Sequence, residues 1–370
     1  MYGYANSTVL RDDSVLNPRN QIAHLAQRSD AGELRFNLKA ENDSLRFTAR
    51  PIISRQVARN SFGSSARNDA YLSQWQVRIN VAEGWNLAAG REVMNWGAAQ
   101  FRSPSSPFYF DNGRNDPVRE LTGMDSAKLT WTPDMQHSMT LAHIVRAGNE
   151  AAQGVWWRDS WLAKFDRRAE DTAYGVVVVK AAQLPSFVGF NAQLTMNDEW
   201  LMYGEASSSV QAHALQSPAD AALPFNVSSP STRRSTALLG TAYTLENGQT
   251  VNAEYLHDGH GYSVAQEHAY FQRARAAPGL ALGLMPRLLG RDYLHLVWQS
   301  NLLDSGGYCR VMATHNVTDG GLSLGAYGEK TLHNRISAFV IAVFSKGTPQ
   351  QEGTALFSRT ITFGLNTSLN

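Results

Sequence analysis

The chain has 370 residues, of which 43% are hydrophobic and 18% are charged, and its formal net charge at pH 7 is +1. This balance predicts neither attraction to nucleic acid nor an acidic tail, so we expect no nucleic-acid partner. The single cysteine, Cys309, excludes a disulfide framework and a cysteine-based metal cluster. No run of eighteen apolar residues predicts a transmembrane helix, but a transmembrane β-barrel needs none, because half of its strand residues face a polar lumen.

The N-terminus, Met1-Tyr-Gly-Tyr-Ala-Asn-Ser, lacks the basic and then apolar pattern of a signal peptide. We therefore expect a mature sequence to which a start methionine was added. A weak strand pattern covers residues 2–10. From Glu33 the pattern is clear, because Leu34, Phe36, Leu38 and Ala40 alternate with Glu33, Arg35, Asn37 and Lys39.

This alternation recurs along the chain in stretches of about ten residues. In the clearest stretch Tyr71, Trp75, Val77, Ile79 and Val81 oppose Gln74, Gln76, Arg78 and Asn80. Short turns are predicted at Asn42-Asp43, Glu83-Gly84, Asn197-Asp198, Glu246-Asn-Gly248 and Asp319-Gly-Gly321. Further strands are predicted at residues 45–50, 85–93, 126–132, 137–145, 161–166, 172–180, 186–196, 200–206, 236–244, 250–255, 292–300, 308–316, 322–331, 335–344 and 358–369.

The short turns contrast with long connections at residues 94–125, 146–160, 207–233 and 257–291. A chain of hairpins must close its sheet or expose an edge, so the prediction is an all-β, transmembrane, antiparallel up-and-down β-barrel. It has short periplasmic turns, long extracellular loops and no helix. If the short turns are periplasmic and the last strand also ends in the periplasm, the strand that begins at Glu33 must run toward the periplasm as well. One more strand must then precede it, which gives about 16 to 18 strands. Residues 1–370 are expected to form one barrel domain.

Two regions also resemble a known group of proteins. The segment Gly90-Arg-Glu-Val-Met-Asn-Trp-Gly97, with Ser103-Pro-Ser-Ser-Pro107 and Arg114-Asn-Asp-Pro117, resembles Gram-negative outer-membrane porin and exopolysaccharide-export barrels, closest to alginate-export-like channels. The segments Asn252-Ala-Glu-Tyr-Leu-His-Asp-Gly259 and Gly290-Arg-Asp-Tyr-Leu294 are similar to the same group. The chain departs from this group at its end, Thr367-Ser-Leu-Asn370, which lacks the usual terminal aromatic residue.

The resemblance implies a channel in the bacterial outer membrane rather than an enzyme, without a cofactor. Its expected partners are outer-membrane lipid and a small polar solute or a polysaccharide. A periplasmic or lumenal protein is a further candidate partner.

Basic residues share the polar side of three successive predicted strands. In a barrel this side lines the pore, where charge sets selectivity. We therefore predict a basic wall that favours anionic solutes or an acidic polysaccharide, although Glu33, Glu92 and Glu254 also point inward. The wall consists of Arg35, Lys39, Arg46, Arg50 and Arg78.

The connection at residues 95–125 is the candidate constriction loop, because it combines aromatic and charged side chains. Aromatic faces can stack on sugar rings while charges orient them. The alternative is an extracellular loop that folds back and is held by its own salt bridges. The candidate residues are Trp96, Phe101, Arg102, Phe108, Tyr109, Asp111, Arg114, Asp116, Arg119 and Glu120.

Three other interpretations are open at this stage. His257-Asp-Gly-His260 with Ser263 offers residues for a metal or hydrolase site, but its spacing matches no nucleophile motif, and we expect no catalysis there. Strands apolar on both faces, at residues 176–179 and 338–343, would suit a barrel that holds a partner protein in its lumen, or a strand packed on an inserted loop. A soluble propeller would require internal repeats, which the chain lacks.

Overall fold

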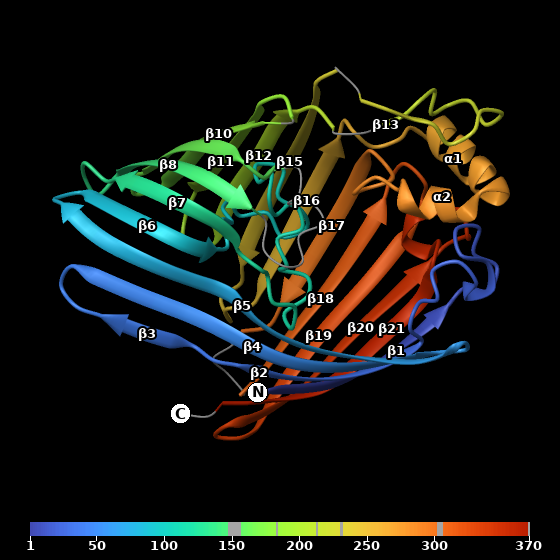
Figure 1. The fold of residues 1–370 in the computed structure, drawn as a ribbon, viewed down its shortest axis with the longest axis horizontal. Helices are drawn as coiled ribbons and strands as arrows, with labels where there is room; N and C mark the ends of the chain where they lie inside the picture. Colours follow the sequence, from blue (N-terminus) through green and yellow to red (C-terminus); the bar gives the residue numbers. More distant parts are fainter. Residues whose placement is uncertain (147–156, 183, 212–213, 230–231, 302–305, 369–370) are drawn as a thin grey trace.

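The computed structural model describes residues 1–146, 157–182, 184–211, 214–229, 232–301 and 306–368 (Figure 1). Most of the predicted connection 146–160, and residue 369 of the last predicted strand, lie outside these ranges. Within them, nineteen strands form one antiparallel sheet. The strands are β1 (Tyr2–Leu10), β2 (Arg28–Arg35), β3 (Leu38–Glu41), β4 (Leu45–Asn60), β5 (Gly63–Ala82), β6 (Trp85–Glu92), β7 (Met124–Trp131), β8 (His137–Arg146), β9 (Ser160–Arg168), β10 (Thr172–Ala181), β11 (Phe187–Thr195), β12 (Trp200–Ser209), β15 (Arg234–Thr244), β16 (Thr250–Asp258), β17 (Asp292–Gln299), β18 (Gly307–Asn316), β19 (Leu322–His333), β20 (Ile336–Lys346) and β21 (Phe357–Thr367).

The sheet closes on itself. Tyr2 of β1 lies opposite Glu33 of β2 on one side and opposite Asn366 of β21 on the other. Because β2 and β3 both pair with β4, they form one interrupted strand, and the nineteen strands make an 18-strand barrel. The predicted fold class is therefore confirmed, including the strand before Glu33.

The barrel has a turn end and a loop end. The turn end carries the chain termini and the short hairpin turns, and the loop end carries the long connections and the helices (Figure 1). Short connections also lie at the loop end, among them residues 61–62 and 317–321. The prediction that groups the Asp319 turn with the others at the opposite end is thus wrong. The Asp319 carboxylate accepts a hydrogen bond from the Gly321 N–H at 2.7 Å. Such a bond stabilises a tight turn at either end of a barrel, so the turn residues do not show at which end the turn lies.

Alternation along each strand separates an outer face from an inner face. In β17, Leu294 and Leu296 are 46% and 54% exposed, whereas His295 and Val297 between them are 2% and 1% exposed. The outer face is rich in exposed apolar side chains, which suits a lipid environment. Loops of the same chain cover part of the inner face, including parts of β10 and β20.

The prediction for Tyr71 is wrong because β5 contains a bulge. Ser73 has no partner in the register with β4, so Gln74 lies opposite Arg50 while Leu72 lies opposite Pro51. The extra residue reverses the alternation. Tyr71 therefore lies opposite the inward-facing Ile52, on the other face from Trp75.

The expectation of no helix is also wrong. The loop between β16 and β17 contains α1 (Val264–Ala276) and α2 (Pro278–Gly283). Ser263 starts α1 with a capping box to Gln266, which satisfies backbone N–H groups at the helix start. Single turns of 3-10 helix, η1 (Pro18–Asn20) and η3 (Glu352–Thr354), and a hairpin of β13 (Ala214–Leu215) and β14 (Val227–Ser228) lie in other loops. None of the described helices is long and apolar enough to cross a membrane.

The helices hold the loops of this end together. Tyr270 and Phe271 of α1 are fully buried and pack with Leu16, Leu215 and Phe225, which come from two other loops. We call this assembly of loops the cap. It covers part of the loop end beside β17–β21, as the upper right of Figure 1 shows.

Candidate functional site

The connection between β6 and β7, residues 93–123, crosses the inside of the barrel, and we call it the crossing loop. The backbone N–H of Ala99 donates to Glu205 of β12 at 3.0 Å, and the carbonyl of Val118 accepts from Arg35 of β2 at 2.6 Å. Figure 1 shows this teal segment between the strands of the two sides. The predicted constriction loop, 95–125, has nearly these bounds, but Met124 and Asp125 already belong to β7.

One buried carboxylate gathers four donors of the crossing loop. Besides Ala99, Glu205 accepts from the hydroxyls of Ser103 and Ser105 at 2.6 and 2.7 Å and from the Ser105 N–H at 3.3 Å. Gly97 has φ +85, and a Cβ there would lie 2.1 Å from the Glu205 carboxylate. Only glycine fits this close approach.

A second carboxylate, Glu254 of β16, binds the next residues of the loop. It accepts the backbone N–H groups of Gln100 and Phe101 at 2.5 and 2.8 Å and the hydroxyl of Tyr203 at 2.6 Å. The alternation in β16 indicated that Glu254 points inward, but no sequence signal singled out Glu205. We call Glu205 and Glu254 the carboxylate anchors.

Apolar contacts hold the loop elsewhere. Phe108 and Tyr109 pack with Val177 and Val179 of β10, which are both fully buried. Farther along the loop, Val118 packs with Phe339 of β20 and its neighbours. The two strands that are apolar on both faces therefore pack on this inserted loop.

Acidic partners accompany most of the predicted basic wall. Arg35 lies 2.6 Å from Glu33 and 3.5 Å from Glu120, and Arg50 lies 2.8 Å from the same Glu120. Glu120 is itself a predicted loop residue, so the loop and the wall meet here.

The other three basic residues lie nearer the turn end. Glu41 lies 2.6 Å from Lys39 and 3.7 Å from Arg46. Arg78 is opposite Arg46 on the neighbouring strand, and its Nε atom is buried without a hydrogen-bond partner among the described residues. Arg78 is thus the member of the wall whose charge is least compensated.

Several aromatic candidates of the loop serve as packing. Phe101, Phe108, Tyr109 and Phe110 are between 3% and 7% exposed. The indole N–H of Trp96 donates to the carbonyl of Ser105 at 3.0 Å. Of these five, Phe101 also lines the smaller open space described below, and Phe110 lines the larger cavity beneath the cap.

The charged candidates divide into two groups. Arg114 donates to the carbonyls of Gly97, Ala98 and Ala99 and so stabilises the loop itself. Arg102, Asp111, Asp116 and Arg119 line open space instead. Asp111 lies 3.0 Å from Arg119 and 3.6 Å from Arg102, so these charges are paired.

This open space, of about 400 Å³, lies between the crossing loop and the inner faces of β17–β20, and we call it the passage. The barrel side of the passage carries several polar side chains beside apolar ones such as Met312 and Val343. The sequence analysis did not name these polar residues as a set, although the alternation in β17–β19 could have found them. They include Tyr293, His295, Thr314, Asn316 and Ser323.

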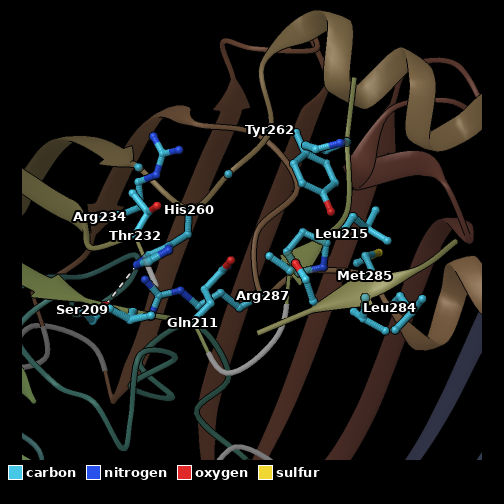
Figure 2. Close-up of a pocket in the computed structure, with 18 of the residues that line it drawn as sticks. Ser209, Gln211, Leu215, Thr232, Arg234, His260, Tyr262, Leu284, Met285 and Arg287 are labelled. Atoms are coloured by element: carbon cyan, nitrogen blue, oxygen red, sulfur yellow. Dashed lines mark hydrogen bonds between the residues drawn. The ribbon is translucent and has the colours of Figure 1, made fainter. Parts of the chain in front are cut away.

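A larger cavity of about 750 Å³ lies beneath the cap, and we call it the vestibule (Figure 2). His260 reaches Ser209 at 3.0 Å there, with Arg234 and Arg287 nearby. Burial lowers the pKa of His260 to about 4, so it is neutral at pH 7. His257 instead faces outward and contacts Asp292 at 2.8 Å, so the two histidines do not form the pair that their spacing suggested.

No protein-family model matches the chain, and no curated protein matches its sequence. Solved structures do match. OccK11 (OpdR) of Pseudomonas aeruginosa has a TM-score of 0.57 at 11% identity, over 99% of this chain and 93% of that one. OccK5 (OpdH) of the same organism has a TM-score of 0.54 at 8% identity, over 100% and 98%. A mutant of the Rh. blastica porin reaches a TM-score of 0.46 at 10% identity, over 99% and 98%. The likeness to the two OccK structures shows that this chain shares their fold.

Proposed function

We propose that the protein is an outer-membrane channel through which small polar solutes cross the barrel by way of the passage. The observation that carries the proposal is the space of about 400 Å³, lined in part by charged and polar side chains, that is left open beside the crossing loop. The OccK structures, which are outer-membrane porins, support the location. The loop end would then face the outside of the cell and the turn end the periplasm.

The passage offers hydrogen-bonding groups from both sides. The loop contributes the ionic group of Arg102, Asp111 and Arg119, and the barrel contributes amide and hydroxyl groups such as those of Asn316 and Ser323. Such groups can replace the water molecules that a polar solute loses at a constriction. The volume is in the range of sites that hold small molecules.

We infer a weak preference for anions. Three acidic residues neutralise most of the basic wall, while Arg78 has no ion pair in the part of the chain that the structure describes. A polysaccharide has less support as the solute. Stacking on sugars needs exposed aromatic faces, and those of Phe108 and Tyr109 are buried in packing contacts.

The lumenal partner protein also loses its support. It was suggested by apolar inner faces on β10 and β20, and residues of the crossing loop cover those faces. A passive channel is therefore the simpler proposal.

Two neighbouring residues of β19 test the passage. Ser323 lines it, whereas Leu324 faces outward and is 46% exposed. We expect Ser323→Trp to lower the single-channel conductance in a planar lipid bilayer severalfold, because the indole fills the space. Leu324→Trp adds the same ring on the lipid side and should leave conductance unchanged.

Liposome swelling with uncharged solutes of increasing size measures the same constriction independently. Ser323→Trp should lower the size limit, and Leu324→Trp should not. Stable insertion of the wild-type protein with no conductance, or equal effects of the two variants, would contradict the proposed path.

A further inference from the structure

Three carboxyl side chains meet beneath α1. Glu267 belongs to α1, Asp319 to the turn between β18 and β19, and Glu352 to η3, after β20. The Asn316 side chain hydrogen-bonds both Glu267 and Glu352, and the Glu352 N–H donates to Asp319 at 2.7 Å, which places the three groups close together. The Glu267 side chain is 1% exposed, so water does not screen these charges.

Two of the three carboxylates are well supplied with donors. Glu352 accepts the Leu289 N–H at 3.0 Å, the Tyr293 hydroxyl at 2.5 Å and the Asn316 amide at 3.2 Å. Asp319 accepts two backbone N–H groups, each at 2.7 Å. These hydrogen bonds favour the ionised form, but burial outweighs them and raises the pKa of both Asp319 and Glu352.

Glu267 differs from both. Its Oε1 atom is buried and has no hydrogen-bond partner among the described residues, and Asn316 supplies the hydrogen bond that favours its charged form. The guanidinium of Arg291 donates a hydrogen bond to the Oε1 atom of Gln266 at 3.2 Å. Of the other charged groups around this cluster, Arg102 acts on Glu352, and His315 acts on Asp319. No cation on a neighbouring element is therefore shown to compensate Glu267.

The position of α1 matters for the whole cap. Its Tyr270 and Phe271 belong to the apolar cluster that joins four loops, including the β20–β21 loop through Ala355. Arg273 also donates to the backbone carbonyls of Ser217 and Asp220 in the loop between β12 and β15. Release of α1 would therefore loosen the cap above the vestibule.

We propose that Glu267 is a pH-sensitive latch, which holds α1 in the cap only while its carboxyl group carries a proton. Loss of the proton would place a negative charge beside the carboxyl groups of Asp319 and Glu352 in a site closed to water. A proton on Glu267 removes this charge.

The direction of the pH effect follows from the buried state. Burial and the two neighbouring carboxylates raise the pKa of Glu267 to about 8, above its ordinary value of 4.5. The docked helix therefore binds the proton more tightly than the released helix. Docking is fully favoured below the ordinary pKa and weakens as the pH rises through about 8.

Amide hydrogen exchange of residues 264–276 tests the latch in the intact protein. We would compare wild type with Glu267→Gln, a neutral group of the same shape, at the same pH, so that the intrinsic pH dependence of exchange cancels. From pH 6 to pH 7 the exchange of wild-type α1 should quicken about tenfold relative to Glu267→Gln, since each pH unit between the ordinary pKa and about 8 changes the docking equilibrium by that factor. Above about pH 8 the ratio of the two exchange rates should level off.

The matched control is Glu246→Gln, which neutralises an exposed carboxylate in the turn after β15 and should behave as wild type at both pH values. Equal pH responses of wild type and Glu267→Gln, or no faster exchange of wild type up to pH 9, would overturn the proposal. Suppression of the response by added Mg²⁺ would also overturn it, in favour of a cation site. The measurement does not require conduction, so it stands apart from the proposed channel function.

Discussion

The crossing loop is held to the barrel by two kinds of contact in two regions. Near β10, Phe108 and Tyr109 are held by apolar packing with Val177 and Val179. Near β12 and β16, the loop backbone is held by carboxylate oxygens. Apolar packing depends on shape and tolerates exchange of similar side chains, whereas each anchor satisfies several buried donors that would otherwise lack partners. The second region should therefore be more sensitive to the loss of one residue.

The largest effect is expected from Glu205→Ala. The substitution leaves the N–H groups of Ala99 and Ser105 and two serine hydroxyls without their acceptor. Unsatisfied buried donors cost about 1–3 kcal/mol each, so we expect a loss of roughly 4 kcal/mol after partial rehydration. Unfolding of the refolded protein in denaturant measures the loss, and the exposed Glu199→Ala is the control. A loss of under 1 kcal/mol would contradict the role of this anchor.

The next effect concerns the apolar region. Phe108 is 4% exposed, and Phe108→Ala should lower the free energy of unfolding by about 3 kcal/mol through lost burial and a cavity. Phe190→Ala removes a ring from the outer face of β11, where 43% of the side chain is exposed, and is the matched control. The comparison between the two regions fails if Phe108→Ala destabilises the protein more than Glu205→Ala does.

The two regions also differ in how much of them the sequence could reveal. Strands apolar on both sides, such as residues 176–179, indicated that something covers the inner wall of β10, and the structure shows that the loop does so. Strand order and closure followed from alternation and parity. The carboxylate anchors left no comparable signal, because a glutamate on the polar side of a strand is common in any barrel.

Other differences have local causes. The bulge at Ser73 places Tyr71 on the inner face of β5, and no residue in this stretch predicts the bulge from the sequence. The α1 sequence carries His268, Tyr270 and Phe271 among its alanines, so its helical character is weak without the contacts of the cap. The pairing of Arg35 and Arg50 with Glu120 joins residues far apart in the chain, which composition cannot show.

A third prediction concerns charge where the crossing loop meets the basic wall. Glu120→Gln removes the carboxylate beside Arg35 and Arg50 while keeping the side-chain shape. If the barrel conducts, uncompensated positive charge should raise its anion-to-cation permeability ratio by roughly twofold. Reversal potentials in a salt gradient measure this ratio, with the exposed Glu83→Gln as control. An unchanged ratio would mean that these arginines do not face the ion path.

The smallest effect is expected from a pair that involves no loop. Glu41 lies near Lys39 and Arg46, but the side chains are about half exposed, at 49%, 51% and 50%. Water already solvates such charges, so Glu41→Gln should change the free energy of unfolding by less than about 1 kcal/mol. Unfolding in denaturant, as for Glu205→Ala, allows the losses in the free energy of unfolding to be compared directly. Similar losses for the two substitutions would show that the burial of Glu205 does not explain how it holds the loop.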